Sequence, residues 1–193
     1  MKTEIEVKFI DIDIDVIRQR LQDVGAECEQ PMRLMRRALI ETDAMTQENA
    51  FLRLRDEGHR TTLTYKMFKE NSLTGAREHE VTVSDYDTMH KILLACGFEF
   101  QTTQESKRET WRLGEVEIVI DQWPWMKPYI EIEAETESAV RETAVLLGFD
   151  WEDAVFGSAD VVYHIEYPNM SVRGVVDIPS VRFDDPVPPE FLG

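Results

Sequence analysis

The chain has 193 residues, 31% of them charged, and this length suits one large domain or one domain with an appended tail. Its formal net charge of −17 disfavours nonspecific nucleic-acid binding, which depends on Lys and Arg neutralising phosphates. No apolar stretch reaches the roughly 18 residues of a membrane helix, and the N-terminus carries no apolar signal region. We therefore expect a soluble cytoplasmic protein with no nucleic-acid or membrane partner.

The sequence predicts three helices and eight strands. Three amphipathic helices are expected at 13–24, 85–96 and 137–147, each followed by a glycine that can adopt the left-handed conformation of a helix end. Ser84 and Thr136 stand where N-caps belong. Runs with a two-residue period predict eight strands, at 4–9, 34–41, 51–55, 61–67, 78–83, 106–113, 116–122 and 130–134.

Eight strands and three helices favour an α+β fold in which an antiparallel sheet closes into an eight-stranded β-barrel with the helices packed outside. After residue 167 the composition changes, because five of the eight prolines fall in the last 26 residues. We divide the chain into a barrel domain, 1–167, and a Pro-rich C-terminal tail, 168–193. The tail could be loosely ordered, could lie across the barrel, or could add a strand at 172–178. Cys28 and Cys96 lack any CxxC pattern and are expected to be buried free thiols.

Most strands carry one charged and one apolar face. Glu4, Glu6 and Lys8 share a face by parity, opposite Ile5 and Val7. On one strand alone, a solvated outer face explains this pattern equally well. However, the charged faces separate into basic strands and acidic strands: Arg53/Arg55, Lys66 and Arg108 against Glu78/Glu80, Glu117/Asp121 and Glu131/Glu133. If the helices cover the apolar faces, the charged faces must line the barrel interior.

A lumen of this kind is costly to dehydrate unless its charges are paired or bound to a ligand. Carboxylates suit Mg²⁺ or Mn²⁺, and metals together with Lys and Arg suit a linear polyphosphate. The sequence contains no P-loop, nucleophile-elbow or zinc-helix motif. A phosphoryl-transfer site without a covalent nucleophile is therefore predicted, and the catalytic residue remains unassigned.

The motif Glu4-Ile5-Glu6-Val7-Lys8 resembles the defining E-x-E-x-K mark of the CYTH superfamily, also called triphosphate tunnel metalloenzymes. An ordered series strengthens the resemblance, which spans residues 1 to about 167: Leu52-Arg53-Leu54-Arg55, Thr64-Tyr65-Lys66, Arg77-Glu78-His79-Glu80, Lys107-Arg108, Ile120-Asp121 and Glu131-Ile132-Glu133. The superfamily includes class IV adenylyl cyclases, thiamine triphosphatases and inorganic triphosphatases.

The resemblance implies roles for individual residues. It assigns Mg²⁺ or Mn²⁺ to Glu4, Glu6, Glu80, Asp121, Glu131 and Glu133. It assigns the substrate phosphates to Lys8, Arg53, Arg55, Lys66 and Arg108, with Arg36 or Arg37 adding a contact that we assign to Arg37. Some members carry a lysine shortly before the tyrosine of the closing segment, whereas Gly157 to Asp160 supply none here, which puts any role of that lysine in doubt.

Three functions remain open. We favour metal-dependent hydrolysis of a triphosphate, either inorganic tripolyphosphate or a nucleoside or thiamine triphosphate, because hydrolysis demands only the tunnel. The alternative is a class IV adenylyl cyclase that converts ATP to cyclic AMP and pyrophosphate. Trp123, Trp125 and Tyr129 could then form an aromatic wall for adenine, although a loop of packing tryptophans is the simpler interpretation. A second alternative is a noncatalytic polyphosphate- or nucleotide-binding module, and a homodimer is compatible with any of the three.

Overall fold

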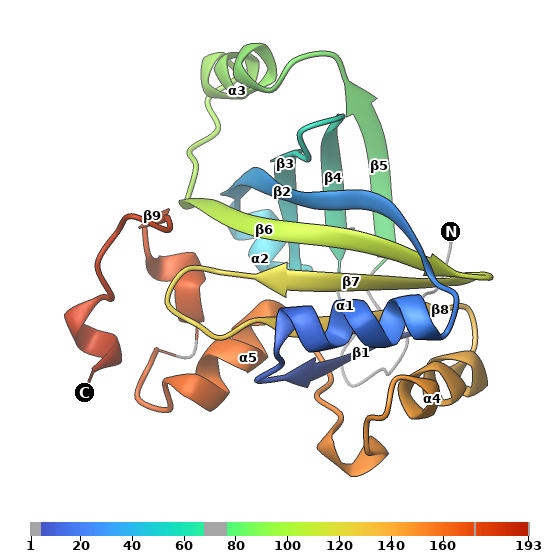
Figure 1. Cartoon of the computed structure of the whole chain (residues 1–193). Helices are drawn as coiled ribbons and strands as arrows, with labels where there is room; N and C mark the ends of the chain where they lie inside the picture. Colours follow the sequence, from blue (N-terminus) through green and yellow to red (C-terminus); the bar gives the residue numbers. More distant parts are fainter. Residues whose placement is uncertain (1–4, 68–76, 172, 193) are drawn as a thin grey trace.

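The computed structural model describes residues 5–67, 77–171 and 173–192, so Glu4 lies outside the described residues. Its strands, labelled in Figure 1, are β1 (Ile5–Ile10), β2 (Glu27–Ile40), β3 (Ala50–Asp56), β4 (Thr61–Met67), β5 (Arg77–Val83), β6 (Thr102–Leu113), β7 (Val116–Gln122), β8 (Tyr129–Ala134) and β9 (Ser180–Val181). Its α-helices are α1 (Ile14–Asp23), α2 (Asp43–Gln47), α3 (Tyr86–Ala95), α4 (Glu137–Leu146) and α5 (Ala159–Glu166). Three short 3₁₀ helices are η1 (Trp151–Asp153), η2 (Gly174–Asp177) and η3 (Pro189–Phe191).

The eight predicted strands form one antiparallel sheet in the order β1-β8-β7-β6-β2-β3-β4-β5, which confirms the α+β class. The short ninth strand, β9, pairs with β6 in parallel. Within the described residues β1 and β5 stand at the two ends of this order and do not pair with each other. The expected closed barrel is therefore not confirmed. The sheet instead curves around a central space, with one open edge at β1 and the other at β5 (Figure 1).

The helices α1, α3 and α4 cover the outer, apolar side of the curved sheet. Ile17 and Leu21 of α1 and Val140 of α4 pack on apolar side chains of β1, β7 and β8, among them Val7 and Ile132. On the other half of the sheet, Leu93 of α3 packs on Ile40 and Leu54. Because apolar residues alternate with charged ones along each strand, covering these faces turns the charged faces toward the interior, as predicted.

Side-chain caps begin the three predicted helices. Asp13 accepts hydrogen bonds from the backbone N–H groups of Asp15 and Val16, and Thr136 caps α4. The expectation for α3 was wrong by one residue, since Asp85 rather than Ser84 is the N-cap and accepts from the Thr88 N–H at 2.7 Å.

The C-terminal segment, residues 173–192, packs against one end of the sheet. Val175, Val181 and Phe191 are buried with Trp123 and Tyr129 in a second apolar core. The strand considered at 172–178 is not formed in the described part of that run, where η2 lies, and β9 follows it. Cys28 and Cys96 are free thiols but exposed, so the expectation that they are buried was wrong. Among the described residues, no helix combines the length and the apolar character needed to cross a membrane.

Candidate functional site

The inward faces of the strands enclose a cavity of about 930 Å³. Acidic side chains of the neighbouring strands β1, β7 and β8 form an acidic wall, and basic side chains of β2, β3, β4 and β6 form a basic wall, beside which Glu78 and Glu80 of β5 also line the cavity. Each strand contributes alternate residues, so that Glu6 and Lys8 of β1 face inward together. The segregation of charge that was inferred from the sequence is therefore present as two walls of one cavity.

Three carboxylates meet on the acidic wall. Glu6, Glu131 and Glu133 each offer a ligand oxygen, and these atoms lie within 4.8 Å of one another. The strand register explains the meeting, because Glu6 pairs with Glu133 and Lys8 with Glu131 across β1 and β8. Burial and repulsion from Glu131 raise the pKa of Glu6, which is the behaviour of acids crowded into one site.

Lys8 pairs with two members of this group. Its Nζ lies 2.8 Å from Glu131 and 3.0 Å from Glu6, and only 2% of its side chain is exposed. Burial by itself would lower the pKa of Lys8, but attraction to Glu131 and Glu6 outweighs burial and raises it. Similarly, burial favours protonation of Glu131, but Lys8 and Arg108 lower its pKa. Lys8 is therefore held charged beside two acidic groups.

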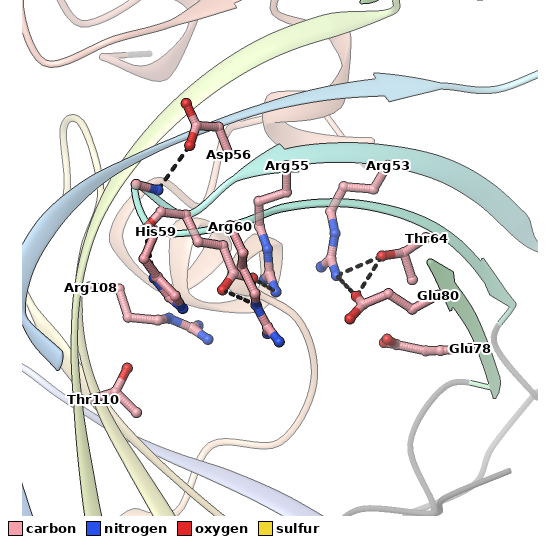
Figure 2. A network of polar contacts seen from close by, with 12 residues as sticks. Arg53, Arg55, Asp56, His59, Arg60, Thr64, Glu78, Glu80, Arg108 and Thr110 are labelled. Carbon is pink, nitrogen blue, oxygen red and sulfur yellow. Dashed lines mark hydrogen bonds and ion pairs between the residues drawn. The ribbon is translucent and has the colours of Figure 1, made fainter. Parts of the chain in front are cut away.

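The basic wall is built on β3, and Figure 2 shows Arg53 and Arg55 directed into the same space as Arg108 of β6. Arg53 lies 3.9 Å from Glu80 of β5, whose carboxylate also accepts a hydrogen bond from Thr64 at 2.8 Å. The Nε atoms of Arg53 and Arg55 are buried without a hydrogen-bond partner in the described part of the chain. Burial and the neighbouring Arg55 lower the pKa of Arg53 to about 9, so this guanidinium is charged but poorly compensated at neutral pH.

Asp121 does not join the three-carboxylate group. It instead accepts two hydrogen bonds from Arg108, at 2.7 Å to Nε and 2.5 Å to Nη2, and one from the Tyr129 hydroxyl at 3.2 Å. This bidentate pair raises the pKa of Arg108 even though burial opposes the charge. Lys66, on β4, pairs with Glu78 of β5 at 2.7 Å. The predicted metal ligands in the described residues therefore fall into two sets. Glu6, Glu131 and Glu133 lie together, whereas Glu80 and Asp121 pair with arginines.

On β2, it is Arg37 rather than Arg36 that lines the cavity. Its guanidinium lines the cavity, stacks on the Trp123 ring at 4.1 Å and donates from Nε to Gln104 Oε1 at 2.7 Å. Arg36 instead pairs with Asp56 at 2.8 Å and lies over the Tyr86 ring. Burial lowers the pKa of Arg37 to about 10.

The sequence reasoning missed one residue that supports the cavity arginines, Glu57, and one that lines the cavity, Arg173. Glu57 is only 3% exposed and pairs with both Arg55 and Arg60. It lies in the β3–β4 turn, whose Asp, Gly and His neighbours indicate a solvated turn, so composition offers no signal of its burial. Arg173 of the C-terminal segment also lines the cavity and pairs with Glu41 at 2.6 Å. Its position in a Pro-rich run gave no hint of this contact.

The aromatic loop is largely occupied by packing. One face of Trp123 is covered by Arg37, and Tyr163 approaches it edge-on. Trp125 donates from Nε1 to the Asp185 carbonyl at 2.7 Å and packs edge-on against Phe191. These contacts agree with the simpler interpretation of packing tryptophans.

Comparisons with known proteins place this chain in a family. The sequence profile of the CYTH domain matches residues 2–147. No protein of curated function matches the chain in sequence. A putative adenylate cyclase from Vibrio parahaemolyticus has a similar structure, with a TM-score of 0.71 and 15% identity over 83% of this chain and 98% of that one.

Two further solved structures share the fold. A conserved hypothetical protein from Pyrococcus furiosus is 21% identical, with a TM-score of 0.66 over 79% of this chain and 94% of that one. A putative adenylyl cyclase from Hippeastrum, described as having a dominant triphosphatase activity, is 15% identical, with a TM-score of 0.56 over 89% of this chain and 98% of that one. The profile match covers well over half of the chain, so this protein belongs to the CYTH domain family.

Proposed function

We propose that this protein is a metal-dependent phosphohydrolase that binds the triphosphate group of its substrate in the charged cavity. One observation carries the proposal, namely that an acidic wall with three converging carboxylates faces a wall of buried arginines across one cavity. A triphosphate is a linear polyanion that binds metal ions through its oxygens. It would therefore engage both walls at once, through metal on one side and directly on the other.

The three carboxylates fit a divalent metal. Glu6, Glu131 and Glu133 supply the hard oxygen ligands that Mg²⁺ and Mn²⁺ prefer, and the convergence of their oxygens within 4.8 Å supports a shared ion. A divalent ion held there would polarise a phosphoryl oxygen and lower the pKa of a coordinated water. We propose that Glu4, outside the described residues, adds a further ligand.

The arginines fit the phosphates. Guanidinium groups present a planar fork that can bind two phosphate oxygens, and Arg53, Arg55 and Arg108 are directed into one space. The partnerless Nε atoms of Arg53 and Arg55 support an anionic ligand, because a buried donor without an acceptor costs about 1–3 kcal/mol. We propose that Lys8, Lys66 and Arg37 complete the phosphate set. We also propose that Glu80 and Asp121 act by holding Arg53 and Arg108.

Hydrolysis is favoured over cyclisation because a cyclase must also bind adenine and orient the ribose 3′-hydroxyl. Of the aromatic residues considered for adenine, Trp125 packs on Phe191, while Trp123 and Tyr129 line the cavity but are already engaged, Trp123 by the Arg37 guanidinium over its ring and Tyr129 by its hydrogen bond to Asp121. The cavity residues that carry the proposal act on phosphate and metal alone. Inorganic tripolyphosphate is therefore the simplest substrate for this site, because its binding requires no contacts to a base or a ribose.

The test is a product analysis with Mg²⁺ or Mn²⁺. We expect release of phosphate from tripolyphosphate, and from ATP we expect ADP and phosphate rather than cyclic AMP and pyrophosphate. Glu131→Gln should abolish turnover, whereas Arg141→Gln, on the exposed side of α4, should leave it unchanged. The proposal fails if the wild-type protein releases phosphate from neither tripolyphosphate, ATP nor thiamine triphosphate. Formation of cyclic AMP would support the cyclase instead, and tight binding without product would support a noncatalytic module.

A further inference from the structure

The cations that line the cavity differ in how their charge is compensated. Lys8 pairs with Glu131, Arg108 with Asp121, and Lys66 with Glu78. In contrast, the polar partner of Arg37 is a neutral amide, the Gln104 side chain at 2.7 Å. Its other close contact is the face of Trp123, and among the described residues no carboxylate lies within ion-pair distance of it. Arg37 therefore has no direct ion pair among the described residues, and the more distant Asp160 attracts it without outweighing burial, which lowers the pKa of Arg37 to about 10.

Gln104 is itself held by the C-terminal segment. Its amide nitrogen donates to the Val175 carbonyl at 3.4 Å and to the Thr102 hydroxyl at 3.3 Å, which turns its oxygen toward Arg37. The backbone of the segment is fixed beside it, because Gln104 pairs with Val181 where β9 joins β6. Gln104 is only 2% exposed, so water cannot readily replace these partners.

The approach of the segment depends on Gly174, which directly precedes Val175. Gly174 has a φ of +60°, and an added Cβ would lie 2.8 Å from the Asp160 carboxylate and 3.3 Å from Met170. A residue with a side chain would therefore strain the backbone at this φ and would have to displace the ends of the Asp160 and Met170 side chains or shift the segment, and with it the carbonyl that holds Gln104. This region lies beyond residue 147, where the match to the CYTH profile ends.

We propose that the C-terminal segment is a positioning element of the substrate site, which acts through Gln104 and Trp123 to hold Arg37 without a direct ion pair, so that its guanidinium can bind a phosphate group. This inference rests on the proposed function, since it names what orients one of the phosphate-binding residues. Gln104 and Trp123 are positioning residues, and Arg37 is the residue that contacts phosphate.

The first test needs no substrate. In the ¹⁵N NMR spectrum of the full chain, the Arg37 Nε–H signal is assigned by its absence in Arg37→Lys, and its hydrogen exchange is measured. We expect slow exchange in the wild type, at least tenfold faster exchange in Gln104→Leu, and continued protection in Gln104→Glu, which keeps the acceptor. Equal exchange rates in the wild type and Gln104→Leu would overturn the positioning role, whether or not the protein hydrolyses tripolyphosphate.

The second test uses tripolyphosphate with Mg²⁺. Gln104→Leu should raise KM about tenfold with a smaller change in kcat, the size expected when a hydrogen bond to a charged group is lost. Gln104→Glu should also raise KM, because its carboxylate neutralises Arg37 without releasing it. If Gln104→Glu binds as well as the wild type, the role of a neutral partner is refuted.

The segment itself is tested by a matched pair of glycine variants. Gly174→Ala should raise KM several-fold and speed the exchange of the Arg37 Nε–H. Gly114→Ala introduces the same backbone strain, at a φ of +58°, but its Cβ has no neighbour within 4 Å, so KM should stay at the wild-type value. Equal effects of the two variants on KM would show that the segment does not act on Arg37. If the wild type has no activity toward any triphosphate, the proposed function fails while the exchange measurements still decide the positioning role.

Discussion

Replacement of Glu131 by Gln separates a metal site from a purely internal network of ion pairs. The change preserves shape but removes the charge that faces Lys8 at 2.8 Å and Arg108 at 3.8 Å. Lys8 keeps Glu6 at 3.0 Å, so we expect the metal-free variant to lose about 1–3 kcal/mol of unfolding free energy rather than the larger cost of an unpaired buried charge.

The measurement that separates the two interpretations is the change in Tm when metal is added. A ligand at 100 times its dissociation constant stabilises a protein by about 2.7 kcal/mol. For a chain of 193 residues, each kcal/mol shifts the Tm by about 2–4 °C. Saturating Mn²⁺ should therefore raise the Tm of the wild type by roughly 5–10 °C in a thermal melt, and EDTA should reverse the shift.

In Glu131→Gln this shift should largely disappear. The matched control is Glu137→Gln, an exposed glutamate of α4 paired with Arg141, which should keep the full response to Mn²⁺. If Mn²⁺ raises the Tm of Glu131→Gln as much as that of the wild type, the three carboxylates are not the metal ligands, and the acidic wall serves only to balance Lys8 and Arg108.

Two predictions concern stability outside the metal group. Burial alone would raise the pKa of Glu57, but Arg55 and Arg60 lower it below the ordinary value of 4.5. Because the folded pKa is depressed, Glu57 stabilises the fold above about pH 4.5, and this contribution is lost as the pH falls through the folded value. Urea midpoints of Glu57→Gln should therefore lie below those of the wild type at pH 7, with the gap narrowing toward pH 3; a constant gap would contradict the assignment. Separately, Glu109 is buried and accepts from Arg18 of α1 at 2.7 Å and from Trp111 Nε1 at 2.7 Å. Glu109→Gln should cost about 1.5–3 kcal/mol in urea unfolding without changing Mn²⁺ affinity, and an unchanged midpoint would show that this contact does not anchor α1.

Local periodicity explains what could be predicted from the sequence. The alternation of Glu6 and Lys8 with Val7 and Phe9 is a property of the strand itself, and it correctly indicated which residues face the cavity. In contrast, the pairing between strands could not be predicted from this alternation. Arg108 and Asp121 are brought together by the register of β6 and β7, which parity cannot specify, so Asp121 could not be distinguished from a metal ligand.

The C-terminal segment shows a second limit. Its prolines and lack of period indicated a tail, yet Val175, Val181 and Phe191 are buried. Their burial depends on Trp123 and Tyr129, more than 40 residues earlier in the chain, and such partners leave no trace in a local pattern. For the same reason, no local pattern predicts that Gln104 contacts both Arg37 and the Val175 carbonyl of this segment.

The unpaired ends of the sheet have a mechanical consequence. Glu6 of β1 attracts Lys66 of β4 across this opening, but in the described residues β1 and β5 share no ladder of backbone hydrogen bonds. The two end strands are therefore joined only through the strands that lie between them in the sheet. If the proposed metal–phosphate ligand contacts both Glu6 and Lys66, it cross-links the two ends of the sheet, and binding of substrate should stiffen the sheet.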